Sequence, residues 1–400
     1  MGSPDTTTAR PFPWLGLLLL SFSIFVSVTS EFLPTGLLPD MARELEVSES
    51  QIGLLITIFA GTVVLTAAPL TAVTRRYSRK SLVIVVLLVF VLANALAAIA
   101  PTYETLAMAR VLGGLAHGLF WAVVGAYSGY LVPKHQIGRA VAVTSGGATA
   151  AFVLGVPVGT AIGHALGWRL AFGVIAVIVV VLVLLVIRFL PAVSHDAPVK
   201  TGEIVLPARK DPSIPAVVIT CLITILVMIG HNTFYTYIAP YLVSVVGFAE
   251  DSIALLLFLY GAAGAVGLVV AGMVSDRFPR AGLVASVALV ALPVFFIGLA
   301  SVAWVVVAAL VIWGMAFGGA PAILQTRLLH AASARIRDVA AAYFTTSFNI
   351  AIGGGALIGG VIFDHISITA LPFVDVAILT VGLALIVAGD IWLKRRAARA

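Results

Sequence analysis

The chain has 400 residues, of which 61% are hydrophobic and 10% are charged, with a formal net charge of +6. Soluble domains carry roughly a quarter charged residues, so this chain has too few charges to cover a soluble surface, and a lipid bilayer is the expected solvent. A membrane-spanning helix needs about 20 mostly apolar residues. Twelve such helices with short loops use nearly the whole chain, which excludes an additional soluble catalytic or nucleic-acid-binding domain.

Apolar segments predict an all-α integral membrane fold with twelve transmembrane helices. The first segment follows Arg10 and is too long for a signal-peptide core, so it is interpreted as a retained helix. The long polar stretch 191–212 contains four prolines and is interpreted as a cytoplasmic linker between two six-helix bundles, 1–190 and 213–400. In chain order the segments are 14–38, 51–73, 81–100, 104–131, 139–163, 168–190, 213–243, 251–273, 281–302, 304–329, 339–363 and 371–393.

The distribution of basic residues predicts the topology, because Lys and Arg favour the cytoplasmic side of a membrane. With the N-terminus inside, all 23 Lys and Arg residues except Arg43, Arg110 and Arg169 face the cytoplasm. Arg43 and Arg169 fall outside, and Arg110 falls within a helix. We therefore expect a multi-pass protein of the cell inner (plasma) membrane with both termini in the cytoplasm. The same bias explains the basic pI without an anionic partner.

An internal repeat relates the two halves. When the chain is shifted by 201 residues against itself, Pro39 meets Pro240, Arg79 meets Arg280 and Gly113 meets Gly314, with no gap over four or five helices. Two six-helix halves that both start inside form a parallel repeat. Many secondary transporters are built in this way, with the substrate site between the halves near the bilayer midplane.

Two loops and the fourth helix carry the motifs that suggest a family. The loop after the eighth segment reads Gly272-Met-Val-Ser-Asp276-Arg277-Phe-Pro-Arg280, and its first-half copy has Arg75 in place of the acid. The loop after the eighth segment, with Asp276 and Arg277, resembles the cytoplasmic signature of the major facilitator superfamily. The fourth segment, with Arg110 followed by glycines, resembles the fourth-helix signature of that family. The resemblance implies twelve helices in two pseudo-symmetric bundles, and a gating role for Gly272, Asp276, Arg277 and Arg280.

Glu31 is the principal candidate for proton coupling. Its surroundings, Thr29-Ser-Glu-Phe-Leu-Pro-Thr-Gly36, resemble the drug/proton antiporters of the superfamily, especially the sugar-efflux branch. Glu31 lies about 10 Å below the outer surface, and Arg110 lies about 9 Å below it. An ionised acid in hydrocarbon costs several kcal/mol unless it is paired or hydrated, so the two groups are expected to form a titrating pair. The alternative is a static ion pair that fixes helix packing.

Two histidines are further candidates. His117 lies two turns from Arg110, where it either relays protons, as its titration near neutral pH allows, or makes a hydrogen-bonded helix contact. His231 lies in an unusually polar part of the seventh segment, next to Asn232, which the repeat aligns with Glu31. A role in the substrate cavity is favoured there. With aromatic candidates, of which many are ordinary packing residues, the predicted substrate-binding set is Phe32, Phe120, Trp121, His231, Asn232, Tyr235, Trp313, Phe317 and Asn349.

The fifth segment carries Gly155, Pro157, Gly159 and Gly163. The three glycines fall on one face and allow close helix approach, and Pro157 removes a backbone hydrogen bond. The segment resembles the antiporter signature of the fifth helix, although Val156 precedes the proline where that signature has glycine. Gly155, Pro157 and Gly159 are therefore predicted to take part in conformational gating, and the resemblance favours export.

These observations predict a proton-coupled antiporter that exports small neutral or weakly cationic compounds, such as drugs or sugars, by alternating access. A proton-coupled importer or a uniporter of the same fold is the closest alternative. An intramembrane enzyme is a more distant one, since no nucleotide-binding loop and no His-Glu-x-x-His motif occurs in the sequence. We expect a monomer that binds a small-molecule substrate and protons within the lipid bilayer, with no catalytic residues, cofactor, metal or nucleic-acid partner.

Overall fold

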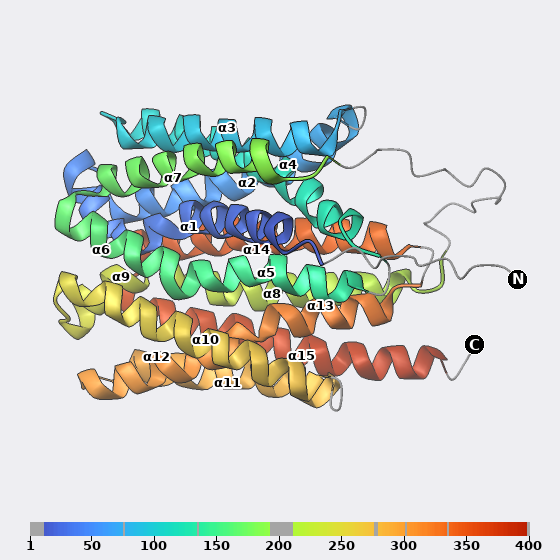
Figure 1. The fold of residues 1–400 in the computed structure, drawn as a ribbon. Helices are drawn as coiled ribbons and strands as arrows, with labels where there is room; N and C mark the ends of the chain where they lie inside the picture. The colour runs from blue at the N-terminus through green and yellow to red at the C-terminus, as the bar shows by residue number, and fades with distance from the viewer. Residues whose placement is uncertain are drawn as a thin grey trace, which may run out of the picture.

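A computed structural model describes residues 12–74, 77–133, 136–192, 211–275, 279–300, 302–333 and 336–397. Within these ranges the chain is helical and has no strand, and twelve helical segments are long and apolar enough to cross a membrane. The predicted all-α membrane fold is confirmed. Both described ends of the chain lie at one end of the bundle, on the right in Figure 1. We call this the terminal end, and the opposite end the distal end.

The first six spans form one bundle, in which α3 packs on α4 and α7, and α1 packs on α2, α5 and α6. The fifth span is α5, a π-helical turn and α6 in succession. The elements are α1 (Trp14–Leu45), α2 (Glu49–Thr74), α3 (Arg79–Ala98), α4 (Tyr103–Tyr130), α5 (Ile137–Ala150), the π-helical turn (Ala151–Gly155), α6 (Val156–Leu166) and α7 (Trp168–Phe189).

The last six spans form the second bundle, in which α8 packs on α14 and α15, and α12 packs on α10 and α11. Most of the predicted linker 191–212 lies outside the described residues. The elements are α8 (Ile214–Tyr235), α9 (Ile238–Tyr241), a π-helical turn (Leu242–Val246), a 3₁₀ turn (Glu250–Ser252), α10 (Ile253–Ser275), α11 (Pro279–Leu299), α12 (Ala303–Gly318), α13 (Ala320–Ala331), α14 (Arg337–His365), a 3₁₀ turn (Ile368–Ala370) and α15 (Leu371–Ala397).

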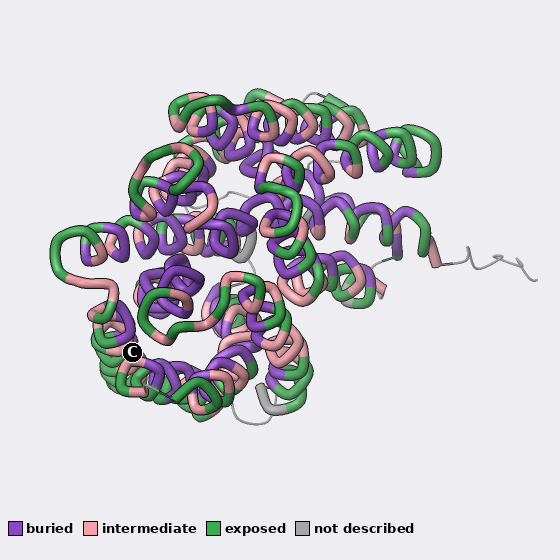
Figure 2. Tube along the Cα trace, turned by 90° about the vertical axis from the view of Figure 1, so that its left-hand side faces the viewer, coloured by how far each residue is buried: buried purple, intermediate pink, exposed green. Residues whose placement is uncertain are grey.

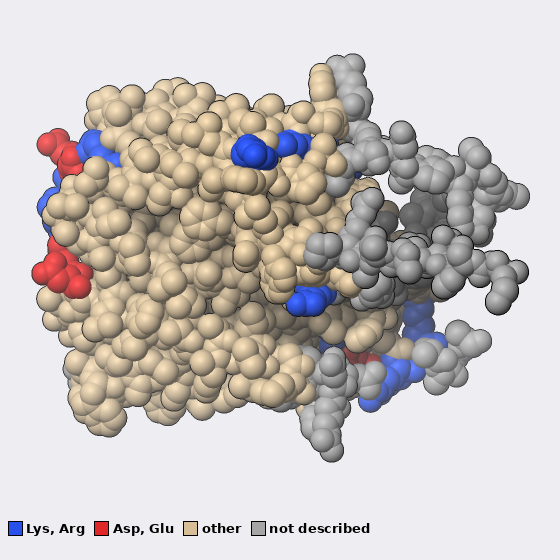
Figure 3. All heavy atoms as spheres, viewed as in Figure 1, with Lys and Arg blue, Asp and Glu red and all other residues tan. Residues whose placement is uncertain are grey.

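Charge and burial follow the pattern of a membrane protein. Seen from the distal end, the buried residues lie on the inward helix faces and the exposed residues on the rim (Figure 2). Charged residues of both signs lie at the distal edge, and a broad uncharged band separates them from the basic residues nearer the terminal end on the face shown in Figure 3. Large apolar residues are exposed on the helices, among them Leu65, Leu166 and Leu255. Apolar side chains are stable in contact with lipid, so exposed apolar residues of this kind are where a bilayer would contact the protein.

The structure extends α1 beyond the predicted end at residue 38. The helix continues through Pro39 to Leu45, and Glu46 then ends it in the left-handed conformation with φ 55°. A proline within a helix removes one backbone hydrogen bond but does not oblige the chain to leave the helix. The last two turns are polar, so a boundary drawn from hydrophobicity falls short. This extension carries Asp40 to the distal surface.

The glycine stripe of the fifth span packs on α1 in its own bundle. An added Cβ at Gly155 would lie 2.0 Å from Thr29 Oγ1, and one at Gly159 would lie 2.7 Å from Leu33 Cδ1. The π-helical turn immediately precedes Pro157, and the N–H of Val156 bonds the carbonyl of Ala151 five residues earlier. A proline that supplies no N–H is a common cause of such local widening. The stripe therefore joins α5 and α6 to α1, and does not face the second bundle.

Equivalent contacts in the two bundles confirm their pseudo-symmetry. In the first bundle, a Cβ added at Gly113 on α4 would lie 2.9 Å from the Phe59 ring on α2. In the second, a Cβ added at Gly314 on α12 would lie 2.3 Å from the Tyr260 carbonyl oxygen on α10. Gly314 and Tyr260 each lie 201 positions after their counterparts, Gly113 and Phe59. The repeat seen in the sequence is therefore a repeat of helix packing.

The two bundles are in contact along two seams. On one seam, Thr57 on α2 donates a hydrogen bond of 2.9 Å to the Gly353 carbonyl on α14. On the other, Gly261 on α10 approaches the Phe152 carbonyl so closely that an added Cβ would lie 2.2 Å from it. At the distal surface, Arg43 bonds Glu250 across the bundles at 2.6 Å. These contacts hold the distal end closed.

Gly261→Ala is expected to shift the protein toward a distally open form. The new methyl group would overlap a backbone carbonyl, which cannot rotate away as a side chain can. Spin labels on cysteines at the exposed distal positions Leu166 and Leu255, in a Cys221→Ser background, measure the separation of α6 and α10. We expect this separation to increase by several ångströms, on the scale of rigid-body rocking. The control is Gly146→Ala, because a Cβ at Gly146 meets nothing within 4 Å. An unchanged distance in Gly261→Ala would contradict the role of this seam.

Candidate transport site

Three ionisable residues of the first bundle lie together inside the protein. Glu31 on α1, and Arg110 and His117 on α4, are each only 3% exposed. All three were predicted as the proton-coupling set, and α1 and α4 bring them together. Burying several ionisable groups in a membrane segment is energetically expensive, which marks the cluster as the strongest candidate for a functional site in this bundle.

Arg110 does not bind the carboxylate of Glu31 in this structure. Its two terminal nitrogens donate to the backbone carbonyls of Ser30 and Glu31, each at 2.9 Å, and its guanidinium lies 4.3 Å from the centre of the Phe59 ring. Pro34 explains the first bond. In an α-helix the N–H of residue 34 would bond the carbonyl of residue 30, and proline has no N–H. Arg110 supplies the missing donor from the neighbouring helix.

The Glu31 carboxylate instead faces His117. Glu31 Oε2 lies 3.6 Å from His117 Nε2, too far for a hydrogen bond, and Glu31 Oε1 has no hydrogen-bond partner. Trp121, one turn along α4, donates from Nε1 to the same His117 Nε2 at 2.7 Å. An indole is only a donor, so this contact requires an unprotonated Nε2. The ring proton therefore lies on Nδ1, which is 2.9 Å from Ser27 Oγ.

This geometry places two groups, the Trp121 indole and the Glu31 carboxylate, at the Nε2 atom of His117. For His117 Nε2 to accept a proton, Trp121 has to turn away, and the released position then faces the carboxylate of Glu31. A proton can thus be exchanged between carboxyl and imidazole only with a change in the Trp121 contact. The arrangement is chemically suited to link protonation to side-chain movement.

Several residues that complete the cluster were missed in the sequence. Ser30 donates to Asn94 Oδ1 on α3 at 2.7 Å, and Asn94 Nδ2 donates to the Phe90 carbonyl at 2.8 Å. Asn94 is a buried amide in an otherwise apolar helix, which was the available signal. Ser27 had no signal of its own, since its importance depends on the position of His117.

The second bundle holds an aromatic cage around His231. The imidazole stacks on Phe317 with ring centres 3.4 Å apart, and the rings of Tyr235, Trp313 and Tyr260 lie 5.0, 5.4 and 6.4 Å away. Four of these five residues were predicted as substrate-binding, and the fold brings them together from α8, α10 and α12. Tyr260 was missed, although the repeat aligns it with Phe59, which lies against Arg110 in the first bundle.

The cage holds unused hydrogen-bonding groups. His231 Nδ1, Tyr260 Oη and Trp313 Nε1 are buried without a hydrogen-bond partner. Asp375 on α15 is fully buried, and neither carboxylate oxygen has a partner. Buried polar groups are normally paired, so unpaired donors and acceptors beside aromatic rings provide the chemistry of a site for a hydroxylated ligand.

The remaining predicted substrate residues are dispersed. Phe32 packs on Phe152 with ring centres 5.0 Å apart, and Phe120 is fully buried against Phe90 inside the first bundle. Asn232 and Asn349 each donate to a backbone carbonyl four residues earlier, and Asn349 Oδ1 is unpartnered.

The structure describes only some of the predicted gating residues in the loop between α10 and α11. Gly272 lies in α10, and a Cβ there would meet nothing within 4 Å. Asp276 and Arg277 lie outside the described residues. Arg280 lies in the first turn of α11, where the backbone alone is described.

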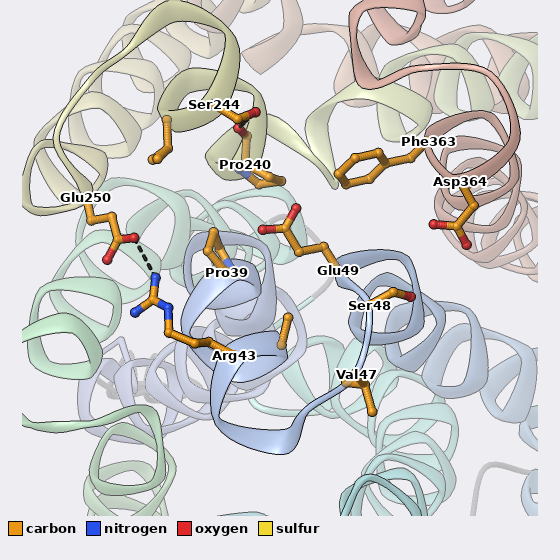
Figure 4. Close-up of a pocket in the computed structure, with 12 residues that line it drawn as sticks. Pro39, Arg43, Val47, Ser48, Glu49, Pro240, Ser244, Glu250, Phe363 and Asp364 are labelled. Carbon is orange, nitrogen blue, oxygen red and sulfur yellow. Dashed lines mark hydrogen bonds and ion pairs between the residues drawn. The ribbon is translucent and has the colours of Figure 1, made fainter.

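A pocket of about 480 Å³ opens at the distal end where the bundles meet (Figure 4). Charged residues from both bundles line it, and Arg43 is paired with Glu250 on one side of it. This pocket is separate from the buried clusters. The lining residues are Pro39, Ala42, Arg43, Val47, Ser48, Glu49, Pro240, Val243, Ser244, Glu250, Phe363 and Asp364.

Two pseudo-symmetric six-helix bundles with buried polar clusters define a polytopic membrane transporter. The family model of the Major Facilitator Superfamily matches residues 20–249 and 220–399. The chain belongs to this superfamily and to its sugar-efflux branch. A probable sugar efflux transporter of Mannheimia succiniciproducens is 31% identical over 368 residues, 92% of this chain and 91% of that protein. One of Helicobacter pylori is 31% identical over 371 residues, 92% of this chain and 93% of that protein.

Solved structures show the same fold at low identity. A D-xylose–proton symporter superposes with a TM-score of 0.79 at 15% identity, covering 94% of this chain and 97% of its own. A bacterial homologue of the human lysosomal transporter Spinster, in an inward-facing and unoccupied conformation, gives a TM-score of 0.75 at 16% identity, covering 96% and 98%. The superfamily and the two sugar-efflux relatives are transporters, which fits the prediction that this chain is not an enzyme.

Proposed function

We propose that this transporter exports sugars or similar small neutral or weakly cationic compounds in exchange for protons, by alternating access. The observation that carries the proposal is the buried Glu31 carboxyl group, with one oxygen unpartnered and the other 3.6 Å from His117 Nε2. Such a carboxyl group is stable when it is neutral and needs a partner or water when it is ionised. It is therefore suited to taking up a proton in one conformation and releasing it in another.

The position of Glu31 on α1 supports coupling to the movement of the bundles. A Cβ added at Gly36, further along this helix, would lie 3.0 Å from Leu257 of α10 in the second bundle and 2.0 Å from Thr160 of α6. Helix α1 is thus in contact with both bundles. A change in charge at Glu31, and in the Trp121 contact at His117, acts on a helix that borders the seam.

The proposed substrate site is the cage around His231. Aromatic faces stack on sugar rings or other flat apolar surfaces, and the unpartnered groups of His231, Tyr260 and Trp313 can bond hydroxyl groups. The two relatives described as probable sugar efflux transporters support this substrate class. We further propose that the protein works as a monomer in the cell inner membrane, with the terminal end in the cytoplasm as the distribution of Lys and Arg indicates.

The experiment is a proton-flux assay with the purified protein in liposomes that contain a pH-sensitive dye. A panel of sugars, dyes and antibiotics is added in turn, with protein-free liposomes as the control. An exporter of the proposed kind moves protons against the substrate, so the lumen changes pH in the opposite sense from that produced by a symporter. Proton movement in the same direction as the substrate would indicate an importer. Substrate movement without any pH change would indicate a uniporter.

A further inference from the structure

We infer that the distal surface holds a binding site for a transition-metal dication, formed by Asp40 and His164 of the first bundle and Glu250 of the second. One ligand atom from each of these three residues lies within 4.8 Å of the other two. Asp40 is on the extension of α1, His164 on the last turns of α6, and Glu250 at the entry to α10. The site lies away from the buried clusters proposed for transport, and it joins the two bundles at the end where they are closed.

The histidine geometry indicates a ligand. The His164 side chain is 6% exposed, and its Nδ1 lies 2.6 Å from Asp40 Oδ2, yet neither ring nitrogen nor that oxygen has a hydrogen bond. The two atoms therefore lie within ion-pair distance but without the alignment of a hydrogen bond. Buried polar atoms are normally satisfied, and a shared cation satisfies both atoms at once.

The donor set indicates the class of metal. Calcium and magnesium prefer oxygen ligands alone, whereas an imidazole with carboxylates is typical of zinc and related transition metals. Zinc takes His nitrogen and carboxylate oxygen at about 2.0–2.2 Å, and a site with three protein ligands leaves a fourth position for water. Small movements of the side chains bring the three atoms to that spacing, because Glu250 is 39% exposed and its carboxylate can turn once Arg43 is displaced.

Arg43 competes for this site. Its guanidinium bonds Glu250 Oε1 at 2.6 Å and lies 3.6 Å from Asp40 Oδ1. The side chain is 62% exposed, so it can swing into solvent when a metal ion takes its place (Figure 4). The metal then replaces a weak surface ion pair between the bundles with coordination bonds. Since Glu250 comes from the second bundle, the ion holds the distal end closed and slows the exchange between conformations.

The test is calorimetric titration of the full-length, chelator-treated protein with Zn²⁺ in detergent. We expect one saturable zinc per chain, with Ca²⁺ and Mg²⁺ unable to compete. His164→Asn is expected to weaken zinc binding at least tenfold. The matched control is His365→Asn, at the repeat-equivalent position, where the exposed imidazole contacts the Val361 carbonyl. Zinc binding that is unchanged in His164→Asn, or that Ca²⁺ matches, would overturn the site.

Two further variants test the bridge between the bundles. Arg43→Ala removes the competing cation, so zinc affinity should rise a few-fold, as expected for the loss of an exposed ion pair. In the wild type, zinc should shorten the distance between spin labels at Leu166 and Leu255 toward its value in the closed form. Glu250→Gln should weaken zinc binding and abolish this shortening. If zinc narrows this distance equally in Glu250→Gln, the ion does not join the bundles. Neither the binding nor the distance measurement depends on the proposed substrate or on proton coupling.

Discussion

Glu31→Gln is expected to abolish substrate-dependent proton movement, reducing it to the level of protein-free liposomes. Glutamine keeps the size and polarity of the side chain but does not exchange a proton. The variant therefore resembles a carrier fixed in the protonated state. Binding of the substrate to the cage in the second bundle should survive, because that cage contains no atom of Glu31. The measurement is proton flux with the liposome dye, together with equilibrium substrate binding to the same preparation.

Glu104→Gln is the control for this experiment. Glu104 is an exposed acid in the first turn of α4, the helix that also carries Arg110 and His117. The control should transport protons as the wild type does. Full proton coupling in Glu31→Gln would show that its carboxyl group is structural, and His117 or Asp375 would then be the next group to vary.

Arg110→Met is expected to destabilise the protein strongly, and Pro34→Ala is expected to restore part of the loss. Without the guanidinium, the Ser30 carbonyl is buried with no donor, which costs about 1–3 kcal/mol. The negative form of Glu31 also loses its nearby positive charge. In the Pro34→Ala background the chain regains an N–H at residue 34, and the normal helical bond to residue 30 forms. Melting temperatures of the four proteins, in a double-mutant cycle, give the coupling between the two positions.

We expect a coupling of about 1 kcal/mol, the net worth of one restored hydrogen bond. Arg395→Met, at an exposed position in the last turn of α15, is the control and should have little effect. If the effects of Arg110→Met and Pro34→Ala on stability are additive, the arginine does not replace the hydrogen-bond donor that Pro34 lacks. If the double variant is stable but still moves no protons, Arg110 has a role in proton coupling in addition to its structural role.

The second bundle supports this interpretation of Arg110. The repeat replaces Pro34 with Tyr235 and Arg110 with Val311. Where the helix has no proline and hence no missing N–H, the intramembrane arginine is absent too. The space that the arginine and its carbonyl partners fill in the first bundle is matched in the second by the aromatic cage.

The twelve spans, the repeat and the buried cluster of Glu31, Arg110 and His117 were all predictable from the sequence. Apolar length, a fixed offset of 201 residues and charges within apolar segments are local signals. The contacts within the cluster were not predictable. Counting residues along α1 and α4 places Glu31 and Arg110 at the same depth. Whether Arg110 binds the carboxylate of Glu31 or backbone carbonyl oxygens depends on helix rotation and on which carbonyl lacks a donor.

Contacts between distant segments set the other limits of prediction. The sequence predicted Phe120 as a substrate-binding residue, but it packs against Phe90 in the interior of its bundle. Aromatic spacing on a helix does not reveal which face points inward. The glycines at 155 and 159 signalled close packing but not the partner helix. The convergence of Asp40, His164 and Glu250 depends on the extension of α1 past Pro39, which a hydrophobicity boundary omits.

The Arg43–Glu250 contact gives the distal closure a sensitivity to the medium. Both side chains are exposed, with Arg43 at 62% and Glu250 at 39%. The Debye length falls from about 10 Å at 0.1 M salt to about 3 Å at 1 M. Dissolved ions therefore weaken such a pair, but leave the part-buried Thr57–Gly353 hydrogen bond, which joins two uncharged groups, nearly unaffected. Ionic strength on the distal side of a sealed vesicle therefore adjusts the balance of conformations without any mutation, while the other side of the membrane remains unchanged.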